Sequence, residues 1–428
     1  MFNCMGTPFR PLLVFLLAIA CVPFQIACAQ VQDRVAAFHF GTGRLEVGQV
    51  RIESMISYSA DRGYGFEGSP ATEAGDGCLT SHAPFYFSVR LPQGNYDVTE
   101  SLGDGAGESD TTVKAELRRL MLQDVRTKPG AVVTRTFTVN MRTPEIAGGG
   151  QVRLKEREKA SEIWDWDDKL TLEFNGSHPC LRAIEISRAD VPTVFLLGDS
   201  TVCDQPAEPW NSWGQMLPRF FKPGIAVSNQ AESGETLGGA LHARRVDKVL
   251  GDMRRGDYLL VQFGHNDMKQ KGPGVGAFTS YKADLEKLVT DTRAHGGTPV
   301  LVTSMNRKSF DPAGQVVNTL RDYPDAVRAV AKEMNVPLID LNAVSKTLYE
   351  AIGKPNIDKA FVDGTHHNAY GSYELARCVI EGIRQNKLDL ARFIVDDLPP
   401  FDPAHPDPID TFKVPASPQS SAQKLLGN

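Results

Sequence analysis

The sequence lacks several features that mark large classes of protein. It has no excess of positive charge, because 46 Lys and Arg residues are outnumbered by 52 Asp and Glu, and the formal net charge is −6. A mildly acidic chain has no electrostatic footprint for nucleic acid, so we expect no such partner. After residue 29 no stretch is long and apolar enough to cross a bilayer. We therefore predict no membrane span in the mature form.

Cysteine is scarce and is never arranged as a C-x-x-C pair, so the sequence predicts no structural zinc site. Three of the seven cysteines lie in the first 29 residues. A lipid-modified Cys21 or Cys28 stays open as an alternative. The spacing of the remaining four allows one or two disulfides and does not choose among the three full pairings. These four are Cys78, Cys180, Cys203 and Cys378.

The first 29 residues have the pattern of a secretory signal peptide. Arg10 precedes an apolar run at 11–20, and Ala27-Cys28-Ala29 forms a small-x-small cleavage pattern. A membrane anchor is the weaker alternative, because the run is short and a proline interrupts the segment that follows it. We predict export to the periplasm or the cell exterior. Cleavage removes the one charge of this segment, Arg10, and takes the net charge from −6 to −7.

Two folded units are expected from the length of 428 residues and from a composition with 41% hydrophobic residues. In residues 31–190 apolar residues alternate with polar ones, as in Phe85, Phe87 and Val89, and turn residues separate the runs. This pattern predicts antiparallel sheets closed as a β-sandwich. We expect strand at 114–125 as well, although the segment is rich in helix-forming residues.

From 191 to 395 short apolar runs alternate with longer amphipathic segments. This alternation predicts a parallel sheet covered by helices on both faces, with ligands at the carboxyl ends of its strands. The proline-rich residues 396–428 are expected to be extended and mobile. The predicted strands are 194–197, 225–228, 258–263, 299–303 and 336–339, and the predicted helices are 212–221, 236–250, 281–294, 323–334 and 368–385.

Three polar segments follow predicted strands or stand near the end of the chain, and together they carry the chemistry of a serine hydrolase. Ser200 in Gly-Asp-Ser needs a base and an anion-binding pocket to act as a nucleophile. Asn266 can offer an uncharged amide N–H to a developing oxyanion. His366, three residues after Asp363, can have its Nδ1–H held by that carboxylate, which leaves Nε2 as the base.

Each segment also has a structural alternative. Ser200 could be the N-cap of a helix, and Asn266 could close an Asx turn. A metal site at Asp363, His366 and His367 ranks lower, because adjacent histidines point in different directions. No Gly-x-Ser-x-Gly elbow occurs, which argues against the α/β-hydrolase fold. A calcium site ranks below a solvated loop at Asp165, Asp167 and Asp168.

The ordered set of blocks resembles the SGNH (GDSL) hydrolases over about residues 192 to 390. The blocks are Gly198-Asp199-Ser200, the glycine in 229–234, Gly264-His265-Asn266-Asp267 and Asp363-x-x-His366. The sequences of residues 198–202, 212–217 and 370–376 are similar to those of the rhamnogalacturonan acetylesterase branch of this family. The β-rich region resembles the galactose-binding-like jelly roll that precedes some of these esterases, with its likeness at 85–89, 102–104 and 166–170.

The resemblance implies an α/β/α domain and a role for each matched residue. Ser200 would be the nucleophile, His366 the base and then the acid, and Asp363 its orienting partner. The N–H groups of Ser200 and Gly234, with the Asn266 amide, would form the oxyanion hole, and no metal or organic cofactor would be required. Asp199 would be structural. Glu235 departs from the family, where a basic residue often follows the glycine.

The implied reaction is removal of O-acetyl groups from a pectic polysaccharide. Trp213, Glu235 and His367 are candidate substrate contacts; Trp213 has a buried aromatic as its alternative, and His367 a packed or solvent-facing ring. Rival functions are an acetylxylan or general carbohydrate acetylesterase, a lipase or thioesterase of the same fold, and a noncatalytic carbohydrate-binding protein. The β-rich region could bind sugar or simply pack, and fold analogy does not choose. Oligomeric state is unknown from the sequence.

Overall fold

The computed structural model describes residues 1–2, 34–52, 56–68, 72–74 and 77–419. The predicted signal peptide lies outside the described residues, apart from its first two. The described residues from 34 to 419 belong to one compact unit. Among the described residues, no helix is both long and apolar enough to cross a membrane.

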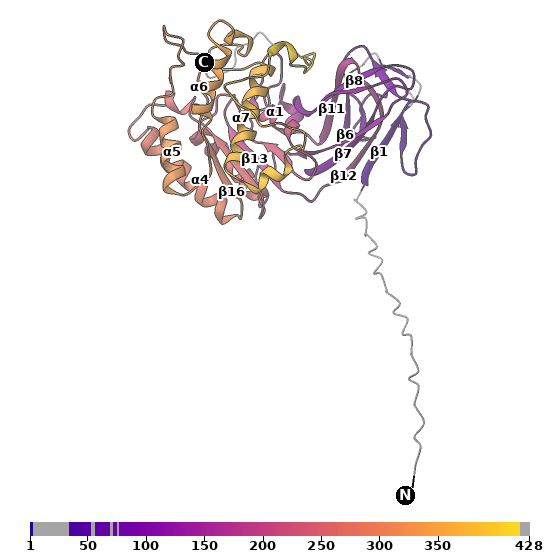
Figure 1. The fold of residues 1–428 in the computed structure, drawn as a ribbon, viewed down its shortest axis with the longest axis horizontal. Helices are drawn as coiled ribbons and strands as arrows, with labels where there is room; N and C mark the ends of the chain where they lie inside the picture. The colour runs from indigo at the N-terminus through magenta and orange to yellow at the C-terminus, as the bar shows by residue number, and fades with distance from the viewer. Residues whose placement is uncertain (3–33, 53–55, 69–71, 75–76, 420–428) are drawn as a thin grey trace. The chain divides into compact units, whose positions relative to one another are not determined.

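Two β-sheets form the N-terminal region (Figure 1). The first contains β1 (Arg34–Phe40), β2 (Val50–Ile52), β4 (Thr72–Ala74), β5 (Leu79–Ser81), β7 (Gly94–Leu102), β10 (Val133–Met141) and β12 (Cys180–Arg188). Its main order is β10-β7-β12-β1-β2, and β5 joins β4 to β12. The second contains β3 (Tyr64–Phe66), β6 (Phe85–Arg90), β8 (Ser109–Ala115), β9 (Arg119–Thr127) and β11 (Lys169–His178), in the order β3-β6-β11-β8-β9.

Aromatic side chains from the two sheets meet in one core. Phe38 and Phe40 of β1 each lie with their ring centroids 5.1 Å from that of Phe87 on β6. The antiparallel β domain is confirmed, and its jelly-roll connectivity stays a prediction. The segment 114–125 is strand as predicted, but a turn at 116–118 divides it between β8 and β9. Glu116 and Arg118 take the left-handed φ values of 55° and 63° there.

An unpaired carboxyl lies in this core. Tyr96, Val98, Glu100 and Leu102 alternate along β7 on its buried side, and each is 0% exposed. Among the described residues, neither carboxyl oxygen of Glu100 has a hydrogen-bond partner. Burial therefore raises the pKa of Glu100 well above its ordinary value of 4.5.

Replacing Glu100 with leucine should stabilise the protein by about 1–3 kcal/mol near neutral pH, because an unpaired polar group leaves the core. Because the pKa of Glu100 is higher in the folded protein than in the unfolded chain, folding loses stability as the pH rises above the unfolded pKa. Below that pKa the protonated glutamate carries no such cost. The gain from Glu100→Leu should therefore grow as the pH rises above the ordinary glutamate pKa of 4.5. Urea unfolding at several pH values measures it, with Glu185→Leu on the neighbouring strand as the control. A gain independent of pH would contradict the assignment.

A parallel sheet follows, in the order β14-β13-β15-β16-β17. Its strands are β13 (Thr193–Gly198), β14 (Ala226–Asn229), β15 (Tyr258–Gln262), β16 (Thr298–Val302) and β17 (Leu338–Ile339), close to the predicted ranges. Because successive strand side chains point to opposite faces, an all-apolar strand must be covered on both. Val194 and Leu196 belong to one core cluster, and Phe195 and Leu197 belong to another.

Seven α-helices among the described residues cover the two faces of this sheet (Figure 1). One core cluster contains residues of α1 (Trp213–Met216), α6 (Leu341–Ile352) and α7 (Ala369–Gln385). The opposite cluster contains residues of α2 (Leu237–His242), α3 (Arg245–Asp252), α4 (Lys282–Ala294) and α5 (Tyr323–Glu333). The three-layer α/β/α class is confirmed. The placing of the domain boundaries at residues 190 and 395 stays a prediction.

Two helix expectations need correction. The helix predicted at 236–250 is broken into α2 and α3 by Arg244, whose φ of 63° is left-handed. Helix α6 was not predicted. It begins after Asp340, whose carboxylate accepts a hydrogen bond from the Ala343 N–H at 3.3 Å. Its apolar residues, including Leu348, pack into the core beside α7.

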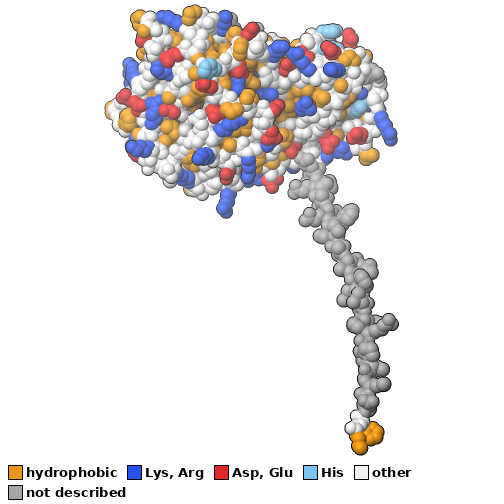
Figure 2. Space-filling view, in the orientation of Figure 1, with side chains coloured by type: hydrophobic (Ala, Val, Ile, Leu, Met, Phe, Trp, Pro, Cys, Tyr) orange, Lys and Arg blue, Asp and Glu red, His pale blue; other side chains and the backbone are white. Residues whose placement is uncertain are grey.

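The proline-rich tail, expected to be mobile, is largely exposed but is anchored to the folded protein near residue 417. Ser417 is 5% exposed, and its hydroxyl lies 2.7 Å from a carboxylate oxygen of Glu173 on β11. Lys114 of β8 donates to the Pro415 carbonyl and to the Ser417 hydroxyl, each at 2.7 Å. These buried polar contacts hold the tail against the β domain. Figure 2 shows acidic and basic side chains interspersed over one face of the protein.

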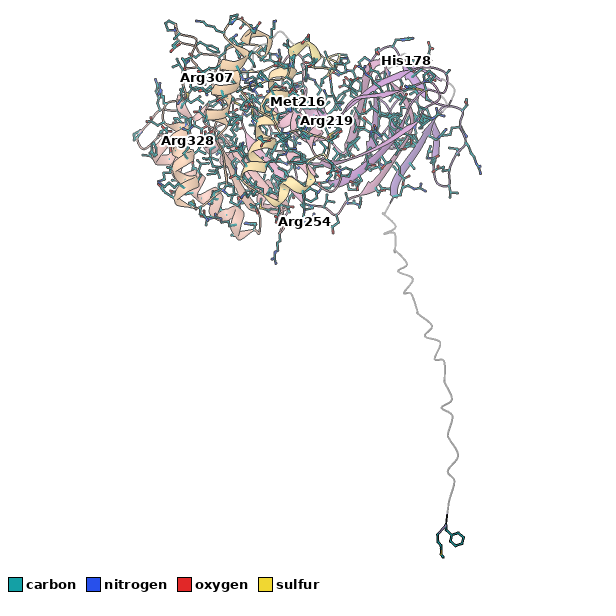
Figure 3. The ribbon with its side chains drawn as sticks, in the orientation of Figure 1. His178, Met216, Arg219, Arg254, Arg307 and Arg328 are labelled. Atoms are coloured by element: carbon teal, nitrogen blue, oxygen red, sulfur yellow. A yellow bond between two sulfur atoms is a disulfide. The ribbon has the colours of Figure 1, made fainter. Side chains whose placement is uncertain are left out.

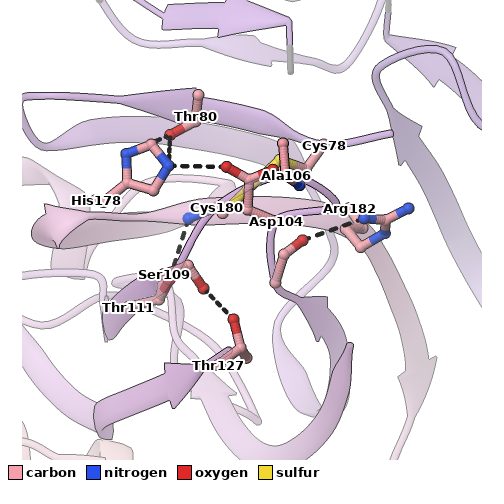
Figure 4. Close-up of a disulfide and its surroundings, with 11 residues drawn as sticks. Cys78, Thr80, Asp104, Ala106, Ser109, Thr111, Thr127, His178, Cys180 and Arg182 are labelled. Atoms are coloured by element: carbon pink, nitrogen blue, oxygen red, sulfur yellow. Dashed lines mark hydrogen bonds and ion pairs between the residues drawn. A yellow bond between two sulfur atoms is a disulfide. The ribbon is translucent and has the colours of Figure 1, made fainter. Parts of the chain in front are cut away.

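One disulfide joins Cys78 to Cys180 at the start of β12 (Figure 4). The two cysteines are 102 positions apart in sequence. This disulfide settles which cysteines pair, which their spacing left open. Beside it, Asp104 accepts a hydrogen bond from His178 at 3.1 Å. Cys203 and Cys378 are buried free thiols, and burial raises the pKa of each above its ordinary value of 9.0.

Candidate active site

Ser200, His366 and Asp363 form a continuous hydrogen-bonded line. The Ser200 Oγ lies 2.7 Å from His366 Nε2, and His366 Nδ1 lies 2.9 Å from an oxygen of Asp363. Ser200 and His366 are 2% and 1% exposed. The serine follows β13 and the other two residues precede α7, so the fold joins groups that are 166 positions apart in sequence.

Asp363 is held as a carboxylate. Its second oxygen accepts the backbone N–H groups of Thr365 and His366, each at 2.7 Å. Burial favours the neutral acid, but the hydrogen bonds from the His366 ring and from these two N–H groups keep the pKa of Asp363 well below its ordinary value of 3.8. The carboxylate can therefore orient the imidazole and stabilise an imidazolium.

The turn that carries Ser200 is built around Gly198 and Asp199. A Cβ at Gly198 would come within 2.8 Å of the Gln262 carbonyl oxygen, so a larger residue would not fit beside β15. Asp199 is 0% exposed and accepts hydrogen bonds from the Thr201 N–H at 3.0 Å and hydroxyl at 2.7 Å. Its other oxygen lies 3.2 Å from His265 Nδ1. Asp199 thus shapes the turn, in line with its expected structural role.

The three N–H donors of the predicted oxyanion hole each have a hydrogen free for another acceptor. Within the described part of the chain, the backbone N–H groups of Ser200 and Gly234 have no internal acceptor. Gly234 has a φ of 72°, which glycine adopts without strain. The Asn266 amide donates one hydrogen to the Glu235 carbonyl at 3.0 Å, which leaves its second hydrogen for another acceptor. Free donors are what an oxyanion hole needs, and its assembly from these three groups stays a prediction.

Replacing Asn266 with alanine should lower kcat about a hundredfold and leave KM little changed, because one donor to the tetrahedral oxyanion is lost. Steady-state kinetics on a small acetyl ester measures the effect. Gln270→Ala, which removes an exposed amide from the same loop, should keep full activity. Equal kcat values for Asn266→Ala and the parent protein would rule Asn266 out of the oxyanion hole.

The three residues predicted as substrate contacts are all turned into the protein. Trp213 is 1% exposed and donates its Nε1–H to Gln262 at 2.9 Å. Glu235 is 6% exposed and pairs with Lys155 at 3.0 Å. His367 is 2% exposed, and its Nε2 lies 2.8 Å from the Tyr349 hydroxyl.

Each of these side chains has a structural partner, and its assignment to substrate stays a prediction. Burial, together with the charges of His366 and His265, lowers the pKa of His367 to about 3. A neutral, packed ring of this kind does not compete with His366 as the base.

Several residues near the triad were missed. The Gln205 amide donates to the Ser200 carbonyl at 2.7 Å, and the Trp210 ring lies edge-on to the His366 ring at 5.7 Å. Arg118, at the tip of the β8–β9 hairpin, donates to the carbonyls of Gln205 and Trp210 at 3.0 and 3.1 Å. No sequence motif marked Arg118, because its partners lie about ninety positions away.

Arg307, labelled in Figure 3, contacts both the loop of Asn266 and the loop of His366. It donates to the Thr365 hydroxyl at 3.1 Å and to the His265 carbonyl at 3.0 Å. Burial lowers the pKa of Arg307, and Asp199 opposes the shift. In the sequence, Arg307 could have been suspected only from its position shortly after a predicted strand.

A second Asp-x-x-His pair, Asp402 and His405, also joins a carboxylate to a histidine Nδ1, but it is exposed and does not belong to the Ser200 line. His405 Nδ1 lies 2.8 Å from Asp402, and Asp402 also accepts the Ala404 N–H at 2.9 Å. The side chains of His405 and Asp402 are 83% and 61% exposed. Because the pair is exposed, it offers an internal control for the buried one.

Two acidic or thiol clusters among the described residues have metal-like spacing, but both have other partners. Cys78, Asp104 and Cys180 include the disulfide, and Glu158, Glu162 and Glu232 pair with Arg245, Arg157 and Lys155. The solvated loop expected at 165–168 is also corrected at Asp165. That residue is 4% exposed and pairs with Arg119 at 3.3 Å and Arg142 at 2.7 Å.

Comparison with known proteins places the site in a wider context. Residues 196–372 match the model of the GDSL-like Lipase/Acylhydrolase family. The chain is 38% identical to the rhamnogalacturonan acetylesterase RhgT of Bacillus subtilis, over 47% of this chain and 94% of that protein. It is 30% identical to the probable rhamnogalacturonan acetylesterase YesY of B. subtilis, over 48% and 98%. It is 26% identical to the uncharacterized esterase YxiM of B. subtilis, over 83% and 92%.

Proposed function

Because the chain belongs to the GDSL-like lipase/acylhydrolase family, we propose that it is a serine esterase that removes O-acetyl groups from rhamnogalacturonan in pectin. The observation that carries the proposal is the Ser200–His366–Asp363 line with unpaired N–H donors beside it. Similarity to two rhamnogalacturonan acetylesterases over nearly their whole length supports the choice of substrate.

The proposed reaction has two steps. Ser200 Oγ attacks the acetyl carbonyl carbon while His366 Nε2 takes the hydroxyl proton, and the oxyanion accepts from Ser200 N–H, Gly234 N–H and Asn266. The bond from the acetyl carbon to the sugar oxygen then breaks, and His366 returns its proton to that oxygen. Water, deprotonated by His366, attacks the acetyl-enzyme, and acetate leaves as Ser200 regains its proton.

We further propose that the protein acts in the periplasm or outside the cell, where it would meet plant polymers. The signal-peptide pattern of residues 1–29 supports this, and so does the Cys78–Cys180 disulfide, since disulfides persist in oxidising compartments. Fractionation of the expressing cells, with the processed N-terminus sequenced, tests it. Full-length protein confined to the cytoplasm would contradict export.

Acetate release from acetylated pectin, compared with acetylated xylan and with long-chain esters, tests the substrate. We expect a clear preference for acetylated pectic rhamnogalacturonan. Faster release from xylan would favour the acetylxylan esterase instead. Cleavage of long-chain esters only would exclude a carbohydrate substrate, and binding of sugar without any turnover would point to a noncatalytic carbohydrate-binding protein.

A further inference from the structure

A segment of the β domain reaches the loop that carries Gly234. This segment, residues 153–166, lies within the connection from β10 to β11. Lys155 Nζ donates to the Ser233 carbonyl oxygen at 3.1 Å, and Arg157 Nη2 donates to the same oxygen. Two cationic donors therefore converge on one backbone carbonyl.

The Ser233 carbonyl belongs to the same peptide group as the Gly234 N–H. A trans peptide is planar, and its C=O and N–H point in opposite directions. Cations at the oxygen end therefore fix the direction of the N–H end. They also draw electron density from the amide nitrogen, which makes the N–H a stronger donor, because linked hydrogen bonds polarise one another.

The cations are held in place by buried carboxylates. Lys155 lies 3.0 Å from Glu235 and 3.6 Å from Glu232, and Arg157 lies 3.3 Å from Glu162 and also pairs with Glu232. These three glutamates are each no more than 7% exposed. The Gly234 loop is further tied to β13, because the Glu232 N–H donates to the Gly198 carbonyl at 3.1 Å.

We propose that Lys155 and Arg157 are positioning residues for ester hydrolysis, which act through the Ser233–Gly234 peptide to orient and strengthen the Gly234 oxyanion donor. The inference rests on the proposed serine esterase function, and it gives the β domain a part in the catalytic site. Neither side chain is required to touch the substrate.

The test compares Lys155→Met, Arg157→Met and Arg157→Lys with the parent full-length protein. Lys159→Met is the matched control, because Lys159 lies in the same segment, is exposed and pairs with Glu156. Turnover of 4-nitrophenyl acetate gives kcat and KM without depending on a polysaccharide. Phenylboronic acid, whose adduct with Ser200 puts an oxygen in the oxyanion hole, reports on that hole directly, and thermal unfolding reports on the fold.

Each methionine variant should lose about tenfold in kcat, less than the loss of a whole donor, with KM little changed. Affinity for phenylboronic acid should fall by a similar factor, Arg157→Lys should recover part of the loss, and Lys159→Met should match the parent. A lower unfolding temperature with kcat and boronate affinity unchanged would overturn the inference and leave the esterase proposal standing. A parent protein that does not hydrolyse the ester would overturn both.

Discussion

Replacing Ser200 with alanine is expected to lower turnover of acetyl esters by at least about ten-thousandfold, because the variant has no nucleophile to form the acetyl-enzyme. The Ser200 Oγ is 2.7 Å from His366 Nε2, and the serine is 2% exposed. Stopped assays of acetate release, run long enough to detect slow turnover, measure the residual rate.

Ser233→Ala is a useful control, since Ser233 is also buried near the site but its hydroxyl contacts Cys203 and Gln205 rather than His366. It should retain far more activity than Ser200→Ala.

Substrate affinity separates the remaining alternatives. If Ser200→Ala hydrolysed acetyl esters at the parent rate, another residue would be the nucleophile. If neither protein turned over ester and both bound sugar equally, the protein would be a noncatalytic binder.

Replacing Asp363 with asparagine should lower kcat about a thousandfold to ten-thousandfold at neutral pH. The Asp363 carboxylate accepts His366 Nδ1–H at 2.9 Å, whereas an asparagine amide could present a donor to that nitrogen and favour the wrong tautomer. The loss should be mainly in kcat, because the imidazole is misdirected while the substrate surface is unchanged. Kinetics over a range of pH measures it.

Asp402→Asn is the matched control for this change. Asp402 meets His405 with the same spacing and nearly the same distance, 2.8 Å, but the pair is exposed. This variant should keep the parent kcat. If Asp402→Asn were as damaging as Asp363→Asn, or if Asp363→Asn were fully active, the assignment of the orienting carboxylate would be wrong.

Much of the fold could be predicted from local patterns. Five mainly apolar runs became the five strands of the parallel sheet, because a strand buried on both faces is mostly apolar. Helix boundaries were predicted less well where a single residue changes the backbone direction, as the left-handed Arg244 does between α2 and α3. The tail after residue 395 has a composition typical of mobile segments, yet Ser417 is buried by distant partners.

Side-chain direction was the part of the site that local patterns could not supply. Trp213, Glu235 and His367 stand next to reactive blocks in sequence, but each turns inward to a partner from another element. Conversely, Arg118 and Lys155 reach the site from the β domain and carry no motif. The contacts of a side chain depend on elements that are distant along the chain, and the local spacing of residues does not reveal these contacts.

The sequence by itself determined which residue types could perform the chemistry: a serine after the first parallel strand, an asparagine after a later one, and an aspartate three residues before a histidine. Spacing alone does not distinguish Asp363-x-x-His366 from Asp402-x-x-His405, and the choice of His366 came from its place among the ordered blocks of the resemblance. Only the tertiary structure brought His366, and not His405, to hydrogen-bond distance from Ser200 in a buried setting. A nucleophile and its base must touch, and contact across 166 positions of sequence is decided by packing.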